Sequence, residues 1–178
     1  LETVSGSGTI ALTNQLSGMT SASVPLLTNA HVPAGNIINV YHHGLATTSI
    51  STTSTSFVAT GLTLTLTPVS ASSKFWITFS NSPHCNGTNN TSWGQYFVYR
   101  DGTRTGIGGG MRFESASGWR TLNQTTQGLD APNTTAAITY TVQFNNSAAN
   151  FHFHVGSHLS GGDSDGTEPA LTILEIKG

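Results

Sequence analysis

Residues 49–68, SISTTSTSFVATGLTLTLTP, carry no charge and consist almost entirely of hydroxyl-bearing, β-branched and leucine residues. In the second half, Leu62, Leu64 and Leu66 alternate with threonines, the period of two typical of a β-strand with one buried face. Threonine suits the other face because its branched Cβ favours extended backbone and its hydroxyl is solvated without a charge. The stretch predicts two strands, at about residues 51–58 and 61–67, separated at Gly61 and ended by Pro68.

The same period recurs in KFWITFSN (74–81) and AAITYTVQFN (136–145), which both predict strands. QYFVYRDGTRTGIG (95–108) predicts a hairpin, because Asp-Gly accepts the positive φ angles of a type I′ turn. PALTILEIKG (169–178) is apolar on both faces, as expected of a central or interface strand. No segment repeats apolar residues at helical spacing, and Gly, Pro and Asn interrupt the chain at short intervals. These patterns predict an all-β fold, an antiparallel sandwich or barrel with nearly no helix.

The length of 178 residues suits one well-buried domain and a connector. Residues 1–35 are rich in small residues and weakly patterned, so we expect an extended connector or docking arm there. The β-sandwich domain is expected over residues 36–178.

Charged residues make up only 8% of the chain, against about 25% in an average globular protein. With 6 Lys and Arg and a net charge of -2, the sequence offers no electrostatic footprint for nucleic acid. It also lacks the apolar run of about 18 residues that a membrane span needs. A lone cysteine, Cys85, excludes an internal disulfide framework and a thiolate zinc site within one chain.

The usual catalytic motifs are missing: the sequence contains no G-x-S-x-G, H-E-x-x-H or G-x-x-x-x-G-K pattern. The glycines of GIGGGMR (106–112) lack the following helix of a phosphate-binding loop and are interpreted as turn residues. We therefore expect a protein that is not an enzyme. A pair of catalytic carboxylates formed in space stays open as an alternative.

NFHFHVG (150–156) places His152 and His154 on one face of a predicted strand, about 7 Å apart. A metal site within one chain would need further ligands, and Ser160 and Gly161 stand where a cupin-type site has its carboxylate. If three chains met around an axis at this strand, six imidazoles would form an octahedral transition-metal site. A solvated outer strand face is the simpler interpretation. No cofactor is expected beyond such an axial metal ion.

Trp93, Tyr96, Trp119 and Arg120 fall in or near predicted loops. Aromatic rings that stack on sugars, next to a guanidinium that binds hydroxyls, form a common type of glycan site. These four residues are the candidate ligand contacts, with burial in a core or an interface as the alternative.

Five segments occur in a fixed order: PAGNIINVYHH, SISTTSTSFVATGLTLTLTPVSASSKFWITFS, YFVYRDGTRTGIG, LDAPNTTAAITYTVQF and GGDSDGTEPALTILEIKG. In this order they resemble a domain of marine bacteriophages, especially cyanophages, over about residues 33–178. The resemblance implies a jelly-roll-like β-sandwich similar to complement C1q and tumour necrosis factor heads. It also implies a homotrimer on a tail fibre or other virion appendage, and it supplies no catalytic residues.

We expect from this resemblance a virion structural protein, the receptor-binding domain of a tail fibre that attaches to a host surface glycan or protein. The alternative is a capsid decoration, or head-fibre, protein that stabilises the shell through its N-terminal arm. A polysaccharide-degrading or cupin-like enzyme is the third hypothesis. In the first two, the partners are two further copies of the chain and other virion proteins, without nucleic acid or membrane insertion.

Overall fold

The computed structural model describes residues 31–45, 50–87, 92–113, 118–147, 152–155 and 168–178. The chain divides into two compact units, Leu1–Val32 and Pro33–Gly178. All the strands described below belong to the second unit. The arm predicted for residues 1–35 lies mostly outside the described residues.

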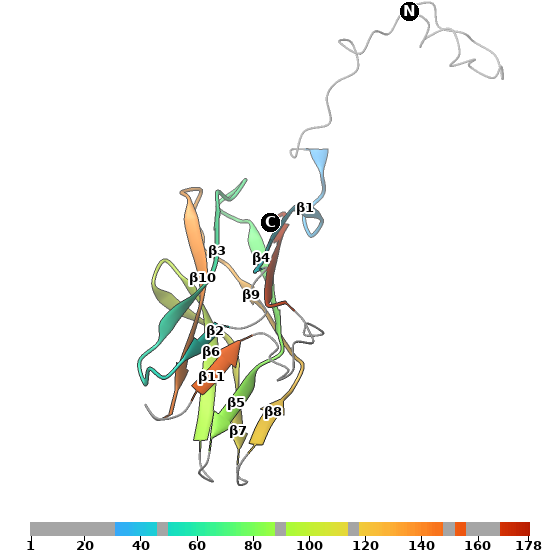
Figure 1. Cartoon of the computed structure of the whole chain (residues 1–178). Coiled ribbons are helices and arrows are strands. Elements are labelled where there is room, and N and C mark those ends of the chain that lie inside the picture. The colour runs from blue at the N-terminus through green and yellow to red at the C-terminus, as the bar shows by residue number, and fades with distance from the viewer. Residues whose placement is uncertain (1–30, 46–49, 88–91, 114–117, 148–151, 156–167) are drawn as a thin grey trace, which may run out of the picture. The chain divides into compact units, whose positions relative to one another are not determined.

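Two four-stranded antiparallel sheets form the body of the domain (Figure 1). The first sheet has the order β1 (Ile37–Gly44), β12 (Ala170–Ile176), β4 (Lys74–Asn81) and β9 (Gln124–Asp130). The second has the order β3 (Val58–Leu66), β10 (Ile138–Asn146), β6 (Ser92–Arg100) and β7 (Thr103–Phe113). The chain passes repeatedly between the sheets, as in a jelly roll. The predicted all-β sandwich is confirmed, and the described residues contain no α-helix.

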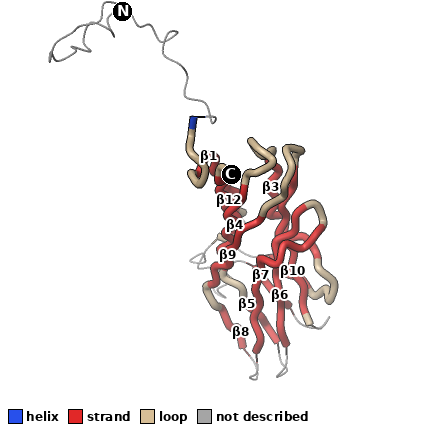
Figure 2. Tube along the Cα trace, turned by 180° about the vertical axis from the view of Figure 1, so that it is seen from behind, coloured by secondary structure: helices blue, strands red, loops and turns tan. Residues whose placement is uncertain are grey.

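A third, smaller antiparallel sheet has the order β2 (Ile50–Thr52), β11 (His152–Val155), β5 (His84–Gly87) and β8 (Gly118–Thr121). Each of its strands directly precedes or follows a strand of the large sheets in the sequence. The small sheet therefore continues the sandwich at one end, where Figure 2 shows β5 and β8.

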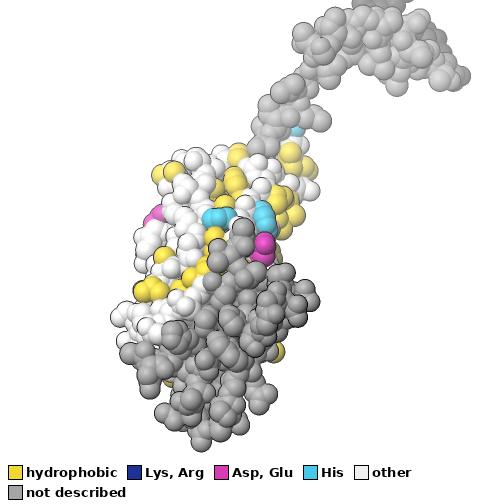
Figure 3. Space-filling view, in the orientation of Figure 1, with side chains coloured by type: hydrophobic (Ala, Val, Ile, Leu, Met, Phe, Trp, Pro, Cys, Tyr) yellow, Lys and Arg dark blue, Asp and Glu magenta, His cyan; other side chains and the backbone are white. Residues whose placement is uncertain are grey.

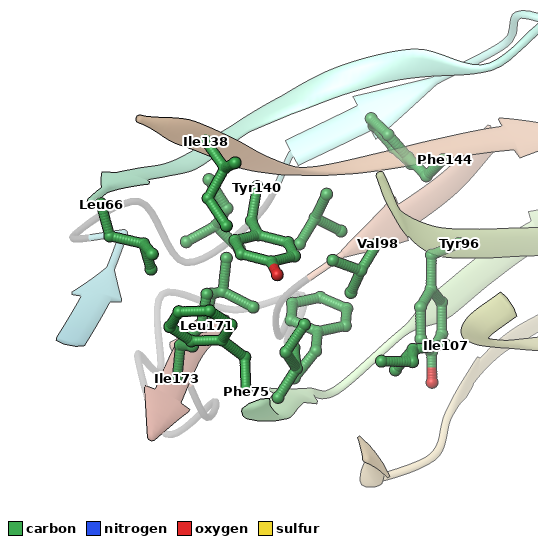
Figure 4. Packing of buried hydrophobic residues seen from close by; sticks show 14 of the residues in the cluster. Leu66, Phe75, Tyr96, Val98, Ile107, Ile138, Tyr140, Phe144, Leu171 and Ile173 are labelled. Carbon is green, nitrogen blue, oxygen red and sulfur yellow. The ribbon is translucent and has the colours of Figure 1, made fainter. Parts of the chain in front are cut away.

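The core lies between the two large sheets and contains the inward side chains predicted by the alternating pattern (Figure 4). Phe75 packs on Tyr140 with ring centroids 6.1 Å apart, and Phe79 meets Tyr96 edge-on at 5.1 Å. Burial of each large apolar side chain stabilises the fold by about 1.5–3 kcal/mol. Together these residues supply the main driving force for folding.

The threonines that alternate with the core leucines form hydroxyl pairs across the outer face. Thr65 Oγ1 lies 3.0 Å from Thr139 Oγ1, and Thr63 Oγ1 lies 3.5 Å from Thr141 Oγ1. Figure 3 shows one face of the molecule, on which uncharged polar side chains and backbone, drawn in white, predominate among the described residues. Hydroxyl groups thus solvate the sheets in place of charges.

The opening stretch folds differently from its predicted division into strands. β3 runs without interruption from Val58 to Leu66, and Gly61, with φ of +91°, marks an irregularity within it. The break falls instead at residues 53–57, because β2 pairs with β11 in the third sheet. The predicted hairpin is confirmed, since Asp101 and Gly102 have φ of 47° and 79° between β6 and β7. β12 is a central strand, as its two apolar faces predicted.

Two carboxylates are held inside the domain by hydrogen bonds. Glu175 is fully buried and accepts bonds from the Val69 backbone N–H at 2.7 Å, from Asn39 Nδ2 at 2.8 Å and from the Tyr41 hydroxyl at 3.3 Å. Asp130 forms an ion pair with Arg100 at 2.6 Å and accepts a bond from the Tyr140 hydroxyl at 2.7 Å.

No helix in the described parts of the chain is long and apolar enough to cross a membrane.

Candidate functional site

A pocket of about 430 Å³ opens at one end of the β6–β7 pair. It is lined by Trp93, Gln95, Met111 and Arg112 and by two glycines, 94 and 110. Trp93 and Arg112 are direct partners in the β6–β7 register, so the indole and the guanidinium belong to neighbouring positions on one face. The indole is 36% exposed and therefore available to a ligand.

The backbone around Trp93 is fixed from both sides of β6. The Trp93 N–H donates to Ser147 Oγ at 2.9 Å, and the Ser147 N–H donates to the Trp93 carbonyl at 2.8 Å. On the other side lies Gly110 of β7, which has no side chain. A Cβ at this position would lie only 2.6 Å from the Gly94 carbonyl oxygen, too close for any larger residue. The pocket is thus a preformed feature of the sheet rather than of a loop.

The outer face of the same sheet continues from the pocket as an aromatic cluster. Phe57 packs against Phe97 with centroids 5.7 Å apart and against Tyr99 at 6.0 Å. The Arg104 guanidinium lies over the Phe97 ring, 3.1 Å from its centroid, which is a cation–π contact. Phe97 is four residues from Trp93 along β6, about 13 Å. Pocket and cluster lie along the same face of β6, and together we call them the track.

The track combines aromatic rings, two arginines and the Gln95 amide, with rows of threonine hydroxyls beside it on β10 and β3. Aromatic faces stack on the apolar faces of sugar rings, and guanidinium, amide and hydroxyl groups bind their hydroxyls. None of the described residues on this outer face of β3, β10, β6 and β7 is acidic. The described outer face therefore offers stacking surfaces together with hydrogen-bond donors and acceptors.

Trp93 is the sequence-predicted ligand contact that lines the pocket, although it lies in β6 and not in a loop. The prediction for Tyr96 is corrected by the structure. Tyr96 is only 1% exposed, and its hydroxyl donates to Gln124 Oε1 at 2.8 Å inside the sandwich (Figure 4). Side chains alternate between the two faces of a strand. Trp93 and Gln95 lie on the outer face of β6, so Tyr96 lies on the inner face.

Trp119 and Arg120 are placed by their backbone in β8, opposite Asn86 and Cys85 of β5. They belong to the third sheet, whereas Trp93 belongs to the second, so strand pairing does not bring the predicted aromatic residues into one site. Their side chains lie outside the described part of the structure.

His152 and His154 are placed in β11, between β2 and β5. Among the residues whose side chains are described, no group of three His, Cys, Asp or Glu residues is suited to hold a metal ion. The side chains of His152 and His154 lie outside that set.

Gln95, Met111 and Arg112 line the pocket but were not predicted from the sequence. Counting outward from the Asp101–Gly102 turn places residue 110 opposite Trp93. The irregularity between Phe97 and Tyr99 in the β6–β7 register shifts the pairing by two residues, so that Arg112 lies there instead. The sequence indicated the hairpin but carried no clear signal for the bulge.

Comparisons with known proteins do not assign the chain to a family. No family model matches it, and no curated protein matches it. Among solved structures, it is similar to the crystal structure of dimeric latent PorU from Porphyromonas gingivalis, with 10% sequence identity and a TM-score of 0.34. That similarity covers 82% of this chain and 14% of the PorU chain.

Proposed function

We propose that this chain is a bacteriophage attachment domain, part of a tail fibre, that binds a glycan on the host surface. The observation that carries the proposal is the preformed pocket in which Trp93 and Arg112 pair across β6 and β7. An exposed indole beside a guanidinium is suited to a sugar ring and its hydroxyls. The phage setting rests on the sequence resemblance over residues 33–178.

Such a domain works by adhesion rather than by turnover. A single shallow site on a sheet binds weakly, and several copies on one particle multiply weak contacts into stable attachment. The composition supports this role. Threonine hydroxyls solvate the outer face in place of charges, and the chain has only 6 lysines and arginines, so it offers few cleavage sites to trypsin-like proteases.

Capsid decoration remains the second candidate role, and an apolar row on the outer face of the first sheet bears on both roles. Val40, Leu174, Trp76 and Leu129 are successive register partners across all four strands. We call these four residues the outer apolar row. Val40 is 65% exposed and Leu129 52% exposed, and Figure 3 shows hydrophobic side chains on the side where β1 lies in Figure 1. In either role we propose that this row is buried between copies of the chain in a homotrimer.

Binding of the purified chain to an array of bacterial lipopolysaccharides and capsular polysaccharides tests the function. We expect one or a few glycans to bind, and Trp93→Ala to weaken that binding at least tenfold. The loss follows from removal of the stacking surface, with the strand pairing of β6 left intact.

Val69→Ala is the matched control, since Val69 is 46% exposed in the loop after β3, outside the pocket. Full binding by the Trp93→Ala protein would contradict the site. An array without any bound glycan, combined with labelling of the domain over the phage head, would favour the decoration role. New reducing ends in a bound polysaccharide would instead show an enzyme.

A further inference from the structure

The aromatic cluster of the track holds an arginine that is stacked on rings and exposed to solvent. Arg104 of β7 is the register partner of Tyr99, and its guanidinium carbon lies 3.1 Å from the Phe97 ring centroid and 5.9 Å from that of Phe57. Within the described part of the chain this guanidinium takes part in no ion pair. The Arg104 side chain is exposed, so its charge faces solvent above an aromatic surface.

The neighbouring charged groups of the same hairpin have structural partners. Arg100 Nη1 lies 2.6 Å from both carboxylate oxygens of Asp130. Asp101, in the turn, accepts a hydrogen bond from the Thr139 backbone N–H at 2.8 Å. These groups hold the hairpin to the rest of the sandwich, whereas Arg104 is positioned by the rings.

A stacked guanidinium is well prepared to bind an anion. It contacts the ring with its flat face, and its N–H groups point outward in the plane of the group. Two parallel N–H donors at its edge match the spacing of the two oxygens of a carboxylate or a phosphate. Stacking on Phe97 also orders the side chain before a ligand arrives, which lowers the conformational entropy lost on binding.

The positions beside Arg104 are polar and neutral. Across β6, Thr141 is the register partner of Tyr99, and Gln143 is that of Phe97. Hydroxyl and amide groups of this kind bind sugar hydroxyls. Among the described residues of this outer face none is acidic, so no carboxylate there repels a ligand of negative charge.

We propose that the glycan bound along the track is anionic, and that Arg104 selects it by binding its carboxylate or phosphate group. Sugar rings stack on the aromatic side chains, and the guanidinium edge binds the anionic substituent. This inference rests on the proposed glycan-binding function and adds to it the class of ligand and the residue that recognises it.

The experiment measures binding of the full chain to acidic bacterial capsular polysaccharides. Each is presented in its native form and after its carboxyl groups are reduced to primary alcohols, and phosphate-bearing teichoic acids are added to the panel. We expect anionic polymers to bind at least tenfold more tightly than the reduced forms, and this preference to shrink as salt screens the attraction. Binding of native carboxylated forms assigns the carboxylate, and binding of teichoic acids alone assigns the phosphate.

Variants of Arg104 test whether this residue makes the selection. Arg104→Gln should weaken binding of the anionic polymer at least tenfold and leave binding of the reduced form within about twofold. Arg104→Lys should lie between the two, because an ammonium keeps the charge and loses the paired donors. Lys74→Gln is the matched control, since it removes the same charge from an exposed position of β4 in the other sheet; this protein should bind as the original does.

A melting curve shows whether each variant folds, and the comparison of native with reduced polysaccharide in the original protein depends on no variant. Equal binding of the native and reduced forms would overturn the inference and leave the proposed glycan function intact, provided that Trp93→Ala still weakens both. An Arg104→Gln protein that folds and loses both forms equally would also overturn it, because Arg104 would then only support the aromatic cluster. A panel without any bound polysaccharide would contradict the inference and the proposed function together.

Discussion

At the scale of single residues, the domain depends on the buried carboxylate of Glu175. Asp130 is paired with Arg100, whereas Glu175 accepts hydrogen bonds from an amide, a hydroxyl and a backbone N–H. These bonds join β12 to β1 and to the loop after β3. Glu175 thus connects three segments that are far apart in the sequence.

We expect Glu175→Ala to lower the free energy of unfolding by about 3 kcal/mol, because the Val69 N–H and the Asn39 amide lose their acceptor inside the protein. Glu175→Gln should cost less than half as much, since its carbonyl oxygen can still accept one bond. Urea unfolding followed by circular dichroism measures both. Equal losses in the two variants would contradict a role as hydrogen-bond acceptor.

Tyr140 gives the domain a dependence on alkaline pH. Burial, followed by its hydrogen bond to Asp130, raises the pKa of the Tyr140 hydroxyl above the ordinary value of about 10. Above that pH the unfolded chain loses a proton that the folded chain keeps, so stability falls as pH rises. Above pH 10 the slope from this group should approach about 1.4 kcal/mol per pH unit. Urea unfolding between pH 8 and 11 should show the slope, and an unchanged slope in Tyr140→Phe would refute this origin.

At the scale of elements, the β6–β7 hairpin is shaped by the close fit of Phe97 on a glycine. A Cβ at Gly108 would overlap the Phe97 ring and the Tyr96 carbonyl oxygen. The ring therefore lies flat against the neighbouring strand, where Arg104 covers it. This packing links the glycine run of the sequence to the aromatic cluster of the candidate site.

Gly108→Ala should therefore destabilise the domain by about 1–3 kcal/mol through overpacking and should displace Phe97. Thr103→Ala, at an exposed position of the same strand, should stay within about 0.5 kcal/mol of the original. Thermal unfolding compares the two, and a stable Gly108→Ala protein with unchanged glycan binding would disprove the tight fit.

At the scale of the whole molecule, the two outer faces of the sandwich differ in character. The face of β3, β10, β6 and β7 carries the pocket and the aromatic cluster, whereas the face of β1, β12, β4 and β9 carries the outer apolar row. The proposed glycan site on one sheet and the proposed interface on the other together describe a multivalent adhesin.

The proposed homotrimer predicts a mass in solution of about three times the 18.6 kDa of the chain, measured by size-exclusion chromatography with light scattering. Leu129→Asp should convert the trimer to monomer, because it places a charge in the buried row. Leu122→Asp, at a leucine that is 53% exposed and outside the row, should remain trimeric. A monomeric original protein, or a Leu129→Asp protein that stays trimeric, would exclude the row as the interface.

The sequence by itself determined the fold class, the β6–β7 hairpin and the central position of β12, because alternation, Asp-Gly and a two-sided apolar strand are local signals. It also marked Trp93, but it could not tell Trp93 from Tyr96, since both are large aromatics and only the register decides which one faces inward. Tertiary structure alone decided that Arg112 lies opposite Trp93, that β2 leaves the opening stretch for a third sheet, and that β5 and β11 pair in that sheet. These pairings join residues distant along the chain and depend on bulges and strand order, which no local pattern encodes.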